Sequence, residues 1–579
     1  MMKSLKILRL LFFILLISVQ AFSAQTSGFK FIVWGDSQFE NPDVFEKYVK
    51  ETNLLQPAFV IHVGDMITGY TYDREKIRAQ WREFKKQIEP LTLPFYPTPG
   101  NHDVTTTETE SLYAEAWGKD KFYYSFDHAD SHFIVLDTSL HARENEIPEE
   151  ERQWLKRDLE EHKSARNIFI SLHVALFLDP NEDWNSIHNL LNQYPVRAVF
   201  AGNSHIYNHK LMDNIHYFIV NTSGSMNFKN HLTGYSHGIL YVSVDEKDVS
   251  YAALSDGRIF PADAVPPDEY RRSPAYFQEE TTLIISSPEK GDVQTMIEIP
   301  VVNRTSEKCA YILRWETDRF EFLFNPFGAS VTLDPGESRK VRFALSIPRG
   351  KYFRDDLPKL RVDSPYKNSA AYETVISSYD YLFSPPEISV SPLNGDFLLD
   401  GRMEDPAWKD VPGIENLYLD KKGTEAKDKT VVKVLYDKEN LYIGVKGEEP
   451  NPAGLKSEAH GPIPYVFADD SFEFYLDPAR TLKTFYRLVV NPRGTILSSG
   501  PKGLFTFSFD VKTYVGKDFW SAEFKIPYAR IKAAPPQKGA EWGMNVRRNR
   551  TQAAYPVSEW SRMRGFPAQP QYFGILKFE

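Results

Sequence analysis

The segment Phe29-Lys30-Phe31-Ile32-Val33-Trp34-Gly35-Asp36 decides the fold, because an apolar run typical of a buried β-strand ends in a glycine and a carboxylate. Glycine lacks Cβ and lets the chain turn sharply out of a strand. Four further runs, all before residue 206, also end in metal-ligating side chains. They are Ala58 to Val63 before Gly64-Asp65, Leu93 to Thr98 before Gly100-Asn101-His102-Asp103, Ile168 to Leu172 before His173, and Arg197 to Ala201 before Gly202-Asn203-Ser204-His205. We expect these ends to meet at one edge of a sheet and assemble a metal centre there.

Helical patterns separate these runs. Apolar residues recur at helical spacing over Pro42 to Leu55, Arg74 to Glu89 and Pro148 to His162. Strands that alternate with helices indicate an α/β fold. The first part of the chain is therefore predicted to be an α/β domain with hydrolase architecture.

The order of the five strand ends resembles that of the calcineurin-like metallophosphoesterases. That family carries Asp-x-His, Gly-Asp-x-x, Gly-Asn-His-Asp/Glu, a lone His and Gly-His-x-His. The resemblance implies that His102 protonates the leaving group and that Asp103 orients its imidazole. It also implies two metals bridged by Asp65, one held by Asp36, Gln38, Asp65 and His205 and the other by Asp65, Asn101, His173 and Asn203.

Two positions depart from the family pattern. Gln38 stands where the family usually has histidine, and Asn203 replaces the first histidine of the last motif. An amide oxygen is a harder and weaker donor than imidazole, which shifts the site from zinc towards manganese, magnesium or calcium. The expected cofactors are two divalent ions, with Mn, Mg, Fe and Zn as candidates. A site that has lost two nitrogen donors also leaves open a degenerate, non-catalytic domain.

The region also resembles the purple acid phosphatases, which place an iron-bound tyrosinate three residues after the bridging aspartate. This chain has Thr68 there, which argues against a ferric purple centre.

The N-terminus has the pattern of a signal peptide over residues 1–24. Lys3, Lys6 and Arg9 precede an apolar run from Leu10 to Val19, and small residues follow. The run is short for a membrane span, and no other stretch approaches one. Cys309 is the only cysteine, so intramolecular disulfides are excluded. We expect an exported protein of the bacterial periplasm, cell surface or medium.

The chain has 579 residues, 42% of them hydrophobic, and a net charge of -10. This length suits three to four domains. Long basic blocks are missing from the sequence, which argues against a nucleic-acid partner because phosphate backbones require clustered Lys and Arg. The phosphoesterase-like domain is expected over 25–260, before a proline-rich linker.

A second, all-β domain is predicted over 275–384. Alternating strands such as Thr295 to Val302 and Lys340 to Ile347 flank the turn Asp334-Pro335-Gly336. This pattern is typical of a small immunoglobulin-like β-sandwich. It carries no catalytic cluster, and we expect it to act as a spacer.

The last domain, over 387–579, also reads as all-β. It resembles the family 9 carbohydrate-binding modules and their DOMON-like relatives. The resemblance rests on segments such as Asp405-Pro406-Ala407-Trp408, Leu441 to Val445 and Asp469 to Glu473. Sugar rings stack on aromatic faces. Trp560 and Tyr555, in a polar segment, are the predicted exposed platforms.

Two other sets of side chains in this domain have expected roles. Trp408, Trp520 and Trp542 are expected in the core. Asp469, Asp470 and Glu473 are candidate ligands for a structural calcium ion, and an ordinary strand with alternating faces explains them equally well.

Together these patterns predict a multidomain protein with an α/β metallophosphoesterase sandwich followed by two all-β sandwiches. The expected function is metal-dependent hydrolysis of a phosphomonoester or phosphodiester, with the last domain binding a glycan or polysaccharide. The alternative is a non-catalytic carbohydrate-binding surface protein with a degenerate phosphoesterase domain.

Overall fold

The computed structural model describes residues 28–579 except 105, 119–121, 140–146, 179, 226–229, 256, 268, 273–281, 354–355, 420–422, 461–464, 502, 505–506, 552, 554–555 and 562–567. The predicted signal peptide, residues 1–24, lies outside this range. In the described part of the chain, no helix is both long and apolar enough to span a membrane.

The chain divides into two compact units. Unit 1 comprises Met1–Gly69, Arg74–Ser273 and Lys367–Tyr372, and unit 2 comprises Tyr70–Asp73, Pro274–Tyr366 and Glu373–Glu579. The finer domain boundaries proposed from the sequence stay predictions.

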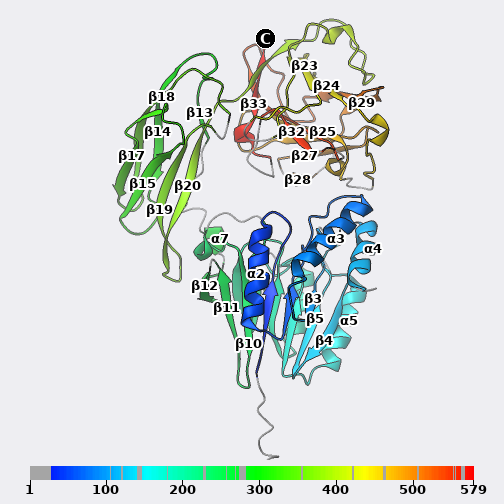
Figure 1. The fold of residues 1–579 in the computed structure, drawn as a ribbon, viewed down its shortest axis with the longest axis vertical. Coiled ribbons are helices and arrows are strands. Elements are labelled where there is room, and N and C mark those ends of the chain that lie inside the picture. The colour runs from blue at the N-terminus through cyan, green and yellow to red at the C-terminus, as the bar shows by residue number, and fades with distance from the viewer. Residues whose placement is uncertain are drawn as a thin grey trace, which may run out of the picture. The chain divides into compact units, whose positions relative to one another are not determined.

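Unit 1 contains two six-stranded sheets (Figure 1). The first has the order β12-β11-β10-β1-β2-β3, and the second β4-β5-β6-β7-β9-β8. The first is built from β1 (Phe29–Trp34), β2 (Phe59–His62), β3 (Phe95–Pro97), β10 (Gly238–Val244), β11 (Val249–Ser255) and β12 (Arg258–Pro261). The second is built from β4 (Tyr124–His128), β5 (Ser131–Val135), β6 (Asn167–Ser171), β7 (Val196–Ala201), β8 (Asn208–Met212) and β9 (Ile215–Ile219).

Helices complete this unit. They are α2 (Pro42–Leu55), α3 (Arg74–Ile88), α4 (Thr107–Trp117), α5 (Glu149–Glu161), α6 (Glu182–Leu191) and the short α7 (Glu269–Arg272). The helices and strands predicted from periodicity therefore form within about one or two residues of their expected bounds.

Three hydrophobic layers hold unit 1 together. Phe31 of β1 and Phe133 of β5 meet at 5.3 Å between the two sheets. Alternate residues of β1 face the other way, where Trp34 packs against Phe45 of α2. Leu155 of α5 belongs to a third cluster on the second sheet. The strands β1, β2, β6 and β7, which form parallel pairs, are buried along almost their whole length, and their near-continuous apolar runs suit strands that are covered on both faces. The predicted α/β class is confirmed.

The five strand ends belong to two sheets rather than to one edge of a single sheet. β1, β2 and β3 pair in parallel in the first sheet, whereas β6 and β7 pair in parallel in the second. The expectation of one sheet edge is therefore wrong. The two sheets bring their carboxyl ends to the same side, so loops from both contribute to one site.

The middle part of unit 2 has a five-stranded sheet, β13-β20-β19-β15-β17, and a three-stranded sheet, β14-β18-β16. Their strands are β13 (Thr282–Ile284), β14 (Val293–Val302), β15 (Cys309–Glu316), β16 (Leu323–Asn325), β17 (Gly328–Leu333), β18 (Ser338–Ile347), β19 (Lys359–Lys367) and β20 (Glu373–Phe383). The predicted turn links β17 to β18, with Gly336 at φ 76° and Glu337 N–H donating to the Asp334 carbonyl at 3.0 Å. Trp315 and Phe343 meet in the core between the sheets.

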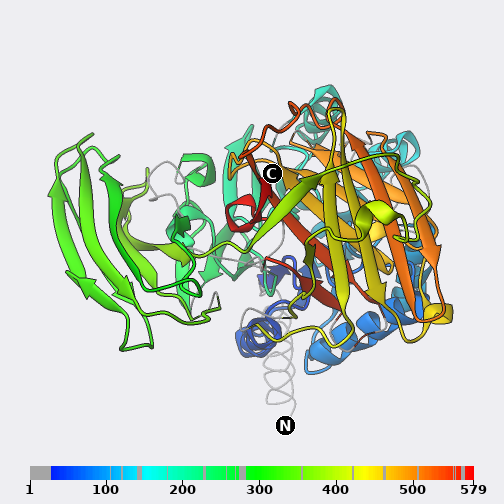
Figure 2. The same ribbon diagram turned by 90° about the horizontal axis from the view of Figure 1, so that it is seen from above.

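The C-terminal strands wrap around a second core in unit 2 (Figure 2). β21 (Glu387–Pro392) joins two antiparallel groups, because it pairs with β33 (Gly574–Phe578) in one and with β23 (Thr430–Tyr436) in the other. The first group also holds β25 (Ser471–Asp477), β26 (Tyr486–Val490), β27 (Ile496–Gly500), β28 (Gly503–Leu504), β31 (Glu541–Asn549) and β32 (Val557–Glu559), and the second holds β22 (Gly413–Ile414), β24 (Asn440–Glu448), β29 (Asp510–Val515) and β30 (Phe519–Pro527). Trp520 stacks on Phe472 at 3.9 Å between them.

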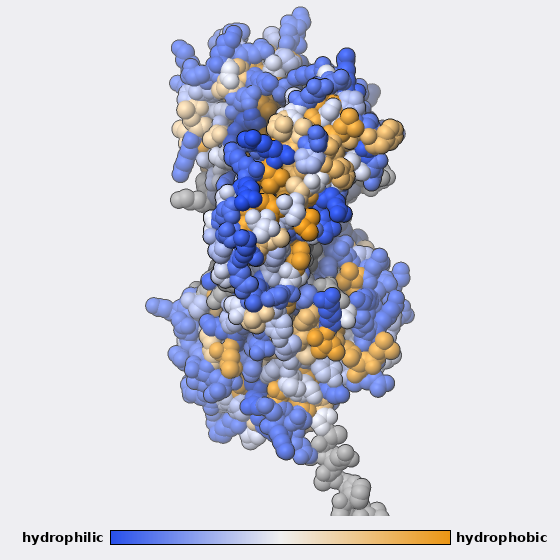
Figure 3. Space-filling model, turned by 90° about the vertical axis from the view of Figure 1, so that its left-hand side faces the viewer, coloured by the Kyte–Doolittle hydropathy of each residue, from blue (hydrophilic) through white to orange (hydrophobic). Residues whose placement is uncertain are grey.

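Both all-β regions thus follow the predicted class. Trp408, Trp520 and Trp542 are buried, as expected. On the face shown in Figure 3, hydrophobic side chains appear among hydrophilic ones.

Candidate metal centre

Unusual backbone geometry brings the ligand loops together. Asp36 and Asp65 have φ of 28° and 61°, in the left-handed region that side chains with Cβ seldom adopt. Gly100 lies so close to the second loop that a Cβ there would fall 2.3 Å from both the amide nitrogen and Oδ1 of Asp65. The glycine in Gly-Asn-His-Asp therefore lets two strand ends touch.

Asp65 lies at the middle of the site and is 1% exposed. Its Oδ1 is 3.2 Å from His173 Nε2, and its Oδ2 is 3.3 Å from Gln38 Nε2. The two carboxylate oxygens thus face two different sets of predicted ligands. A bridging carboxylate requires this arrangement.

The first set is Asp36, Gln38, Asp65 and His205. Asp36 Oδ1 lies 3.3 Å from His205 Nε2. Single ligand atoms of Asp36, Asp65 and His205 all fall within 4.8 Å of one another, a spacing that can close around one ion. The Gln38 side chain joins this group through its contact with Asp65.

The second set gathers Asp65, Asn101 and His173. His173 Nε2 lies 3.0 Å from Asn101 Oδ1. Its Nδ1 donates to the Val63 carbonyl at 2.7 Å, which fixes the ring and leaves Nε2 on the side of the carboxylate. The structure therefore brings these three predicted ligands together, and their role as ligands stays a prediction.

Asn203 does not join the second set through its amide. Its side chain is exposed and makes no hydrogen bond to the residues the structure describes, while its main-chain N–H donates to Asp36 Oδ1 at 3.0 Å. Asn203 therefore orients Asp36, and its role as a ligand stays a prediction.

His102 lies beside the centre but is held differently than expected. Its Nδ1 donates to the Thr68 carbonyl at 2.6 Å, and its Nε2 is 3.9 Å from Asp65 Oδ2. Asp103 instead accepts from the backbone N–H groups of Gly100, Asp65, Met66 and Ile67. The prediction that Asp103 orients the imidazole is wrong, because its carboxylate is used to fold the Asp65 loop.

Ser225 and His62 were missed by the sequence analysis. Ser225 Oγ donates to Gln38 Oε1 at 2.6 Å, and His62 Nε2 lies 3.1 Å from Ser37 Oγ. Because His62 Nδ1 accepts from Gly64 N–H, its Nε2 carries the proton that reaches Ser37. Ser225 stands in no motif, and His62 ends an apolar run where a core role is the default, so the sequence gives neither a signal.

Charge in the centre shifts several pKa values. Burial raises the pKa of Asp65, but His173 and His102 outweigh it and hold that pKa well below its usual range. Burial lowers the pKa of His173, yet Asp65 outweighs it and raises that pKa to about 10. Burial lowers the pKa of His62 to about 3, so this ring is neutral. The Asp65 carboxylate thus stabilises positive charge beside it.

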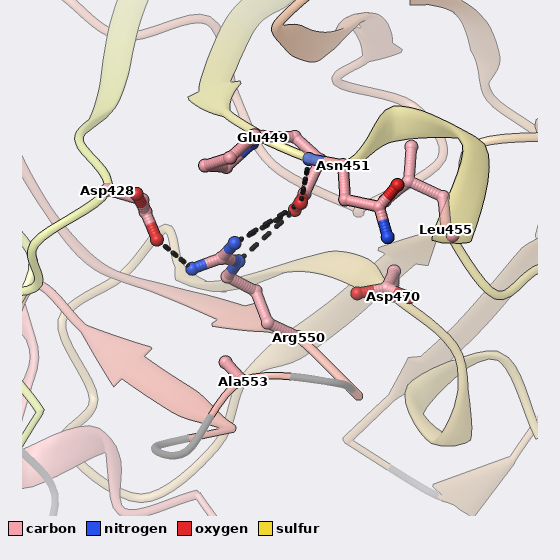
Figure 4. Close-up of a pocket in the computed structure, with 9 residues that line it drawn as sticks. Asp428, Glu449, Asn451, Leu455, Asp470, Arg550 and Ala553 are labelled. Atoms are coloured by element: carbon pink, nitrogen blue, oxygen red, sulfur yellow. Dashed lines mark hydrogen bonds and ion pairs between the residues drawn. The ribbon is translucent and has the colours of Figure 1, made fainter.

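The C-terminal sandwich contains a polar cavity of about 320 Å³ (Figure 4). Arg550 lies on one side of it between Asp428 and Glu449, and binds both, with Glu449 Oε2 3.1 Å from Arg550 Nη2. Asn451 and Asp470 lie on the other side. The lining residues are Asp428, Glu449, Pro450, Asn451, Gly454, Leu455, Asp470, Arg550 and Ala553.

Trp560, one of the two predicted aromatic platforms, does not line this cavity. Trp560 is 7% exposed and belongs to the core of the sandwich, where a Cβ at Gly574 would lie 2.6 Å from its ring. The expectation of an exposed Trp560 is therefore wrong, since tertiary packing draws the ring inward. Tyr555 lies outside the described residues.

The three carboxylates that are candidate calcium ligands accept hydrogen bonds from protein groups. Asp469 accepts from the N–H groups of Glu458 and Ala459, and Glu473 binds Arg487 at 2.6 Å. Asp470 accepts from Lys456 N–H at 2.7 Å. These contacts account for the buried charges without a cation.

The comparisons with known proteins agree with this geometry. Residues 29–207 match the family model described as calcineurin-like phosphoesterase. The N-terminal domain is a calcineurin-like phosphoesterase domain. Such domains use a dinuclear metal centre, and the two ligand sets around Asp65 suit one. Residues 399–578 match the model described as carbohydrate family 9 binding domain-like, so the chain also carries a carbohydrate-binding domain.

Individual relatives are distant. Acid phosphatase type 7 of Mus musculus is 28% identical over 23% of this chain and 32% of its own length. A protein of Arabidopsis thaliana named probable inactive purple acid phosphatase 27 is 28% identical over 36% of this chain and 38% of its own length. The chain thus spans about a third of the length of the curated relatives it matches.

Among solved structures, a family 9 carbohydrate-binding module from Caldicellulosiruptor kristjanssonii in complex with cellotriose is 20% identical, with a TM-score of 0.27. It covers 33% of this chain and 93% of its own.

Proposed function

We propose that this protein is an exported, metal-dependent hydrolase of phosphate esters that its C-terminal domain holds on a glycan. The observation that carries the catalytic part is the position of Asp65, whose two oxygens face His173 on one side and Gln38 on the other. Asp65 alone can therefore bridge two neighbouring ions, one on each of its carboxylate oxygens.

The donor set suits two divalent cations. Asp36 and Asp65 supply carboxylate oxygens, Gln38 and Asn101 supply amide oxygens, and His173 and His205 supply one nitrogen each. This mixture favours manganese, magnesium or iron over a site built for zinc alone. When bound, the cations would lower the pKa of an attacking water and neutralise charge that builds on the phosphoryl oxygens.

Two side chains of the protein assist the reaction beside the cations. His102 Nδ1 is committed to the Thr68 carbonyl, which turns Nε2 towards the centre, where a protonated ring can give its proton to the leaving oxygen. Asp103 accepts from three N–H groups of the Asp65 loop and from Gly100 N–H, and so fixes the distance between the bridging carboxylate and His102.

Glycan binding is assigned to the polar cavity of the C-terminal sandwich. Its carboxylates, amide and guanidinium offer donors and acceptors on facing walls, which is the chemistry that reads sugar hydroxyls. Export rests on the signal-peptide pattern of residues 1–24. Recovery of the mature chain from the medium or periplasm, with cleavage near residue 24 by N-terminal sequencing, tests this part.

The test of catalysis is reconstitution of the purified chain with Mn²⁺, Mg²⁺, Fe²⁺ or Zn²⁺, followed by a panel of phosphomonoesters and phosphodiesters. We expect about two ions per chain and turnover that chelation abolishes. Two bound ions without turnover on any ester would refute the hydrolase assignment.

A second function has one observation in its favour. The exposed Asn203 amide reaches no other ligand among the described residues, which suits a domain that has lost one metal and acts only as a carbohydrate-binding surface protein. Fewer than about two ions per chain at saturating metal would support it.

A further inference from the structure

The loop after β9 carries a serine that contacts two predicted ligands of the candidate metal centre. Ser225 is 1% exposed. Its Oγ lies 2.6 Å from Gln38 Oε1 and 3.4 Å from His205 Nδ1. Gln38 lies in the loop after β1 and His205 in the loop after β7, so these two ligands come from different sheets. Both belong to the first set, and one hydroxyl therefore joins two ligands of the same ion.

The main chain of Ser225 is held on both sides of the residue. Its N–H donates to Thr222 Oγ1 at 2.8 Å and to the Asp36 carbonyl at 3.1 Å. Its carbonyl accepts from His237 Nε2 at 2.7 Å and from Asn41 Nδ2 at 3.2 Å. Because these four contacts fix the backbone, the position of the hydroxyl is set by the fold and does not require a bound ion.

The glycine before this serine allows the loop to approach the ligands. A Cβ at Gly224 would lie 2.3 Å from the Ser37 carbonyl oxygen. The Gly224 N–H also donates to the Asp36 carbonyl at 3.3 Å. A larger residue at this position would push the loop away from the strand end that carries Gln38, and the hydroxyl would move with it.

An ion in the first set requires a defined orientation of both neighbours of Ser225. His205 Nε2 lies 3.3 Å from Asp36 Oδ1 and is the nitrogen that faces the centre, so Nδ1 carries the proton when Nε2 binds an ion. Gln38 binds an ion through its oxygen, which turns its amide nitrogen towards Ser225. A hydroxyl oxygen can accept two hydrogen bonds, so Ser225 can satisfy the N–H groups of both ligands at once.

We infer that Ser225 is a positioning residue that orients Gln38 and His205 towards one of the two ions, the ion of the first set. This inference deepens the proposed function and rests on it for the presence of metal. The outer hydrogen-bond partner of a metal-binding side chain is typically worth about 10–100-fold in metal affinity. His173, in the second set, is held by the Val63 carbonyl at 2.7 Å, so the effect of Ser225 should be confined to one ion.

Titration of the metal-free, full-length protein with Mn²⁺ tests the inference. In Ser225→Ala, the affinity for one ion should fall about tenfold or more, and the affinity for the other should not change. Electron paramagnetic resonance gives an independent signature, because two Mn²⁺ ions bridged by one carboxylate couple magnetically and a single ion does not. At a Mn²⁺ concentration that just fills both sites of the wild type, Ser225→Ala should show the spectrum of an isolated ion.

The matched control is Ser223→Ala. Ser223 is equally buried in the same loop, and its Oγ donates to the Gly35 carbonyl at 2.5 Å rather than to a ligand side chain. Ser223→Ala should keep both Mn²⁺ affinities and the spectrum of the coupled pair. An equal loss of affinity in Ser223→Ala and Ser225→Ala would assign the effect to folding of the loop and overturn the inference.

A double-mutant cycle shows whether Ser225 acts through its neighbour. If the hydroxyl orients Gln38, Ser225→Ala should cost less affinity in a Gln38→Ala background than in the wild type, since the partner has been removed. An undiminished loss in that background would overturn the inference, and so would an unchanged Mn²⁺ titration in Ser225→Ala. A wild type that binds no Mn²⁺ would refute the proposed function as well.

Discussion

Gln38 Nε2 lies 3.3 Å from Asp65 Oδ2, so the amide that replaces the family's usual histidine sits against the carboxylate expected to bridge two ions. Its Oε1 points at Ser225 Oγ, 2.6 Å away. The oxygen and nitrogen of an amide are nearly interchangeable in shape, and turning the amide by half a turn would place Oε1 towards the centre and let Nε2 donate to Ser225. Ser225 can thus hold Gln38 in either orientation.

This relationship predicts the effect of Gln38→His. A nitrogen donor in place of an amide oxygen should raise the affinity for Zn²⁺ relative to Mn²⁺. Competition titrations of the two ions measure the ratio. Asn203→His serves as the comparison, since the Asn203 amide is exposed and its main chain makes the contact with Asp36. An unchanged ratio in Gln38→His would mean that this side chain does not bind metal.

The bridging role of Asp65 predicts two separable losses. Asp65→Asn should abolish metal loading and turnover together, because one residue contacts both ligand sets. His102→Ala should leave metal content unchanged and slow turnover about a hundredfold or more, since it removes only the proton donor. Elemental analysis and initial rates distinguish the two. Substantial activity in Asp65→Asn would contradict the two-metal assignment.

Stability should fall with rising pH because of Glu151. This residue is 2% exposed, and burial raises its pKa from 4.5 to about 8. The folded state then binds more protons than the unfolded state, so the contribution is full below about pH 4.5 and is lost as the pH rises towards 8. One such group changes the free energy of unfolding by at most about 1.4 kcal/mol per pH unit.

Glu151→Gln should remove this dependence. The amide keeps an oxygen for Asp137 N–H, which donates to Glu151 Oε1 at 2.8 Å, but it does not ionise. Urea unfolding between pH 5 and pH 8, a range chosen from this shift, is the measurement. Glu161→Gln, at an exposed position of the same helix, is the control and should keep the wild-type slope.

The strands and helices of the first domain could be predicted well from the sequence. The reason is that the apolar pattern of each segment depends on which of its own residues are buried. It could not tell that β1 and β6 belong to different sheets, since both are buried apolar runs and look alike in the sequence. Asp103 was assigned the wrong partner for a related reason. The N–H groups that donate to it are placed by the fold of the Asp65 loop, which no spacing in the motif records.

Trp560 illustrates the limit in the C-terminal domain. A tryptophan in a polar segment suggests an exposed ring, yet the main-chain N–H of Trp560 donates to the Val546 carbonyl at 3.0 Å and its ring enters the core. Side-chain direction at the end of a short strand is set by its neighbours in the sheet. The polar cavity around Arg550 combines residues from 428 to 553 and has no sequence signature.

That cavity supplies the last prediction, which separates catalysis from targeting. Asn451 lines it, is exposed, and has its main chain rather than its amide bound to Glu449 at 3.1 Å, so Asn451→Ala should remove a sugar contact without unfolding the sandwich. Retention on an insoluble polysaccharide that binds the wild type should fall, whereas hydrolysis of a small soluble phosphoester should not change. Linked modules raise the effective concentration at a surface without altering a separate active site.

A chain cut near Pro386 should lose retention altogether, and Asn416→Ala, outside the cavity, should behave like the wild type. If the truncated and full-length proteins bound a broad set of polysaccharides equally, the C-terminal domain would not be the glycan anchor.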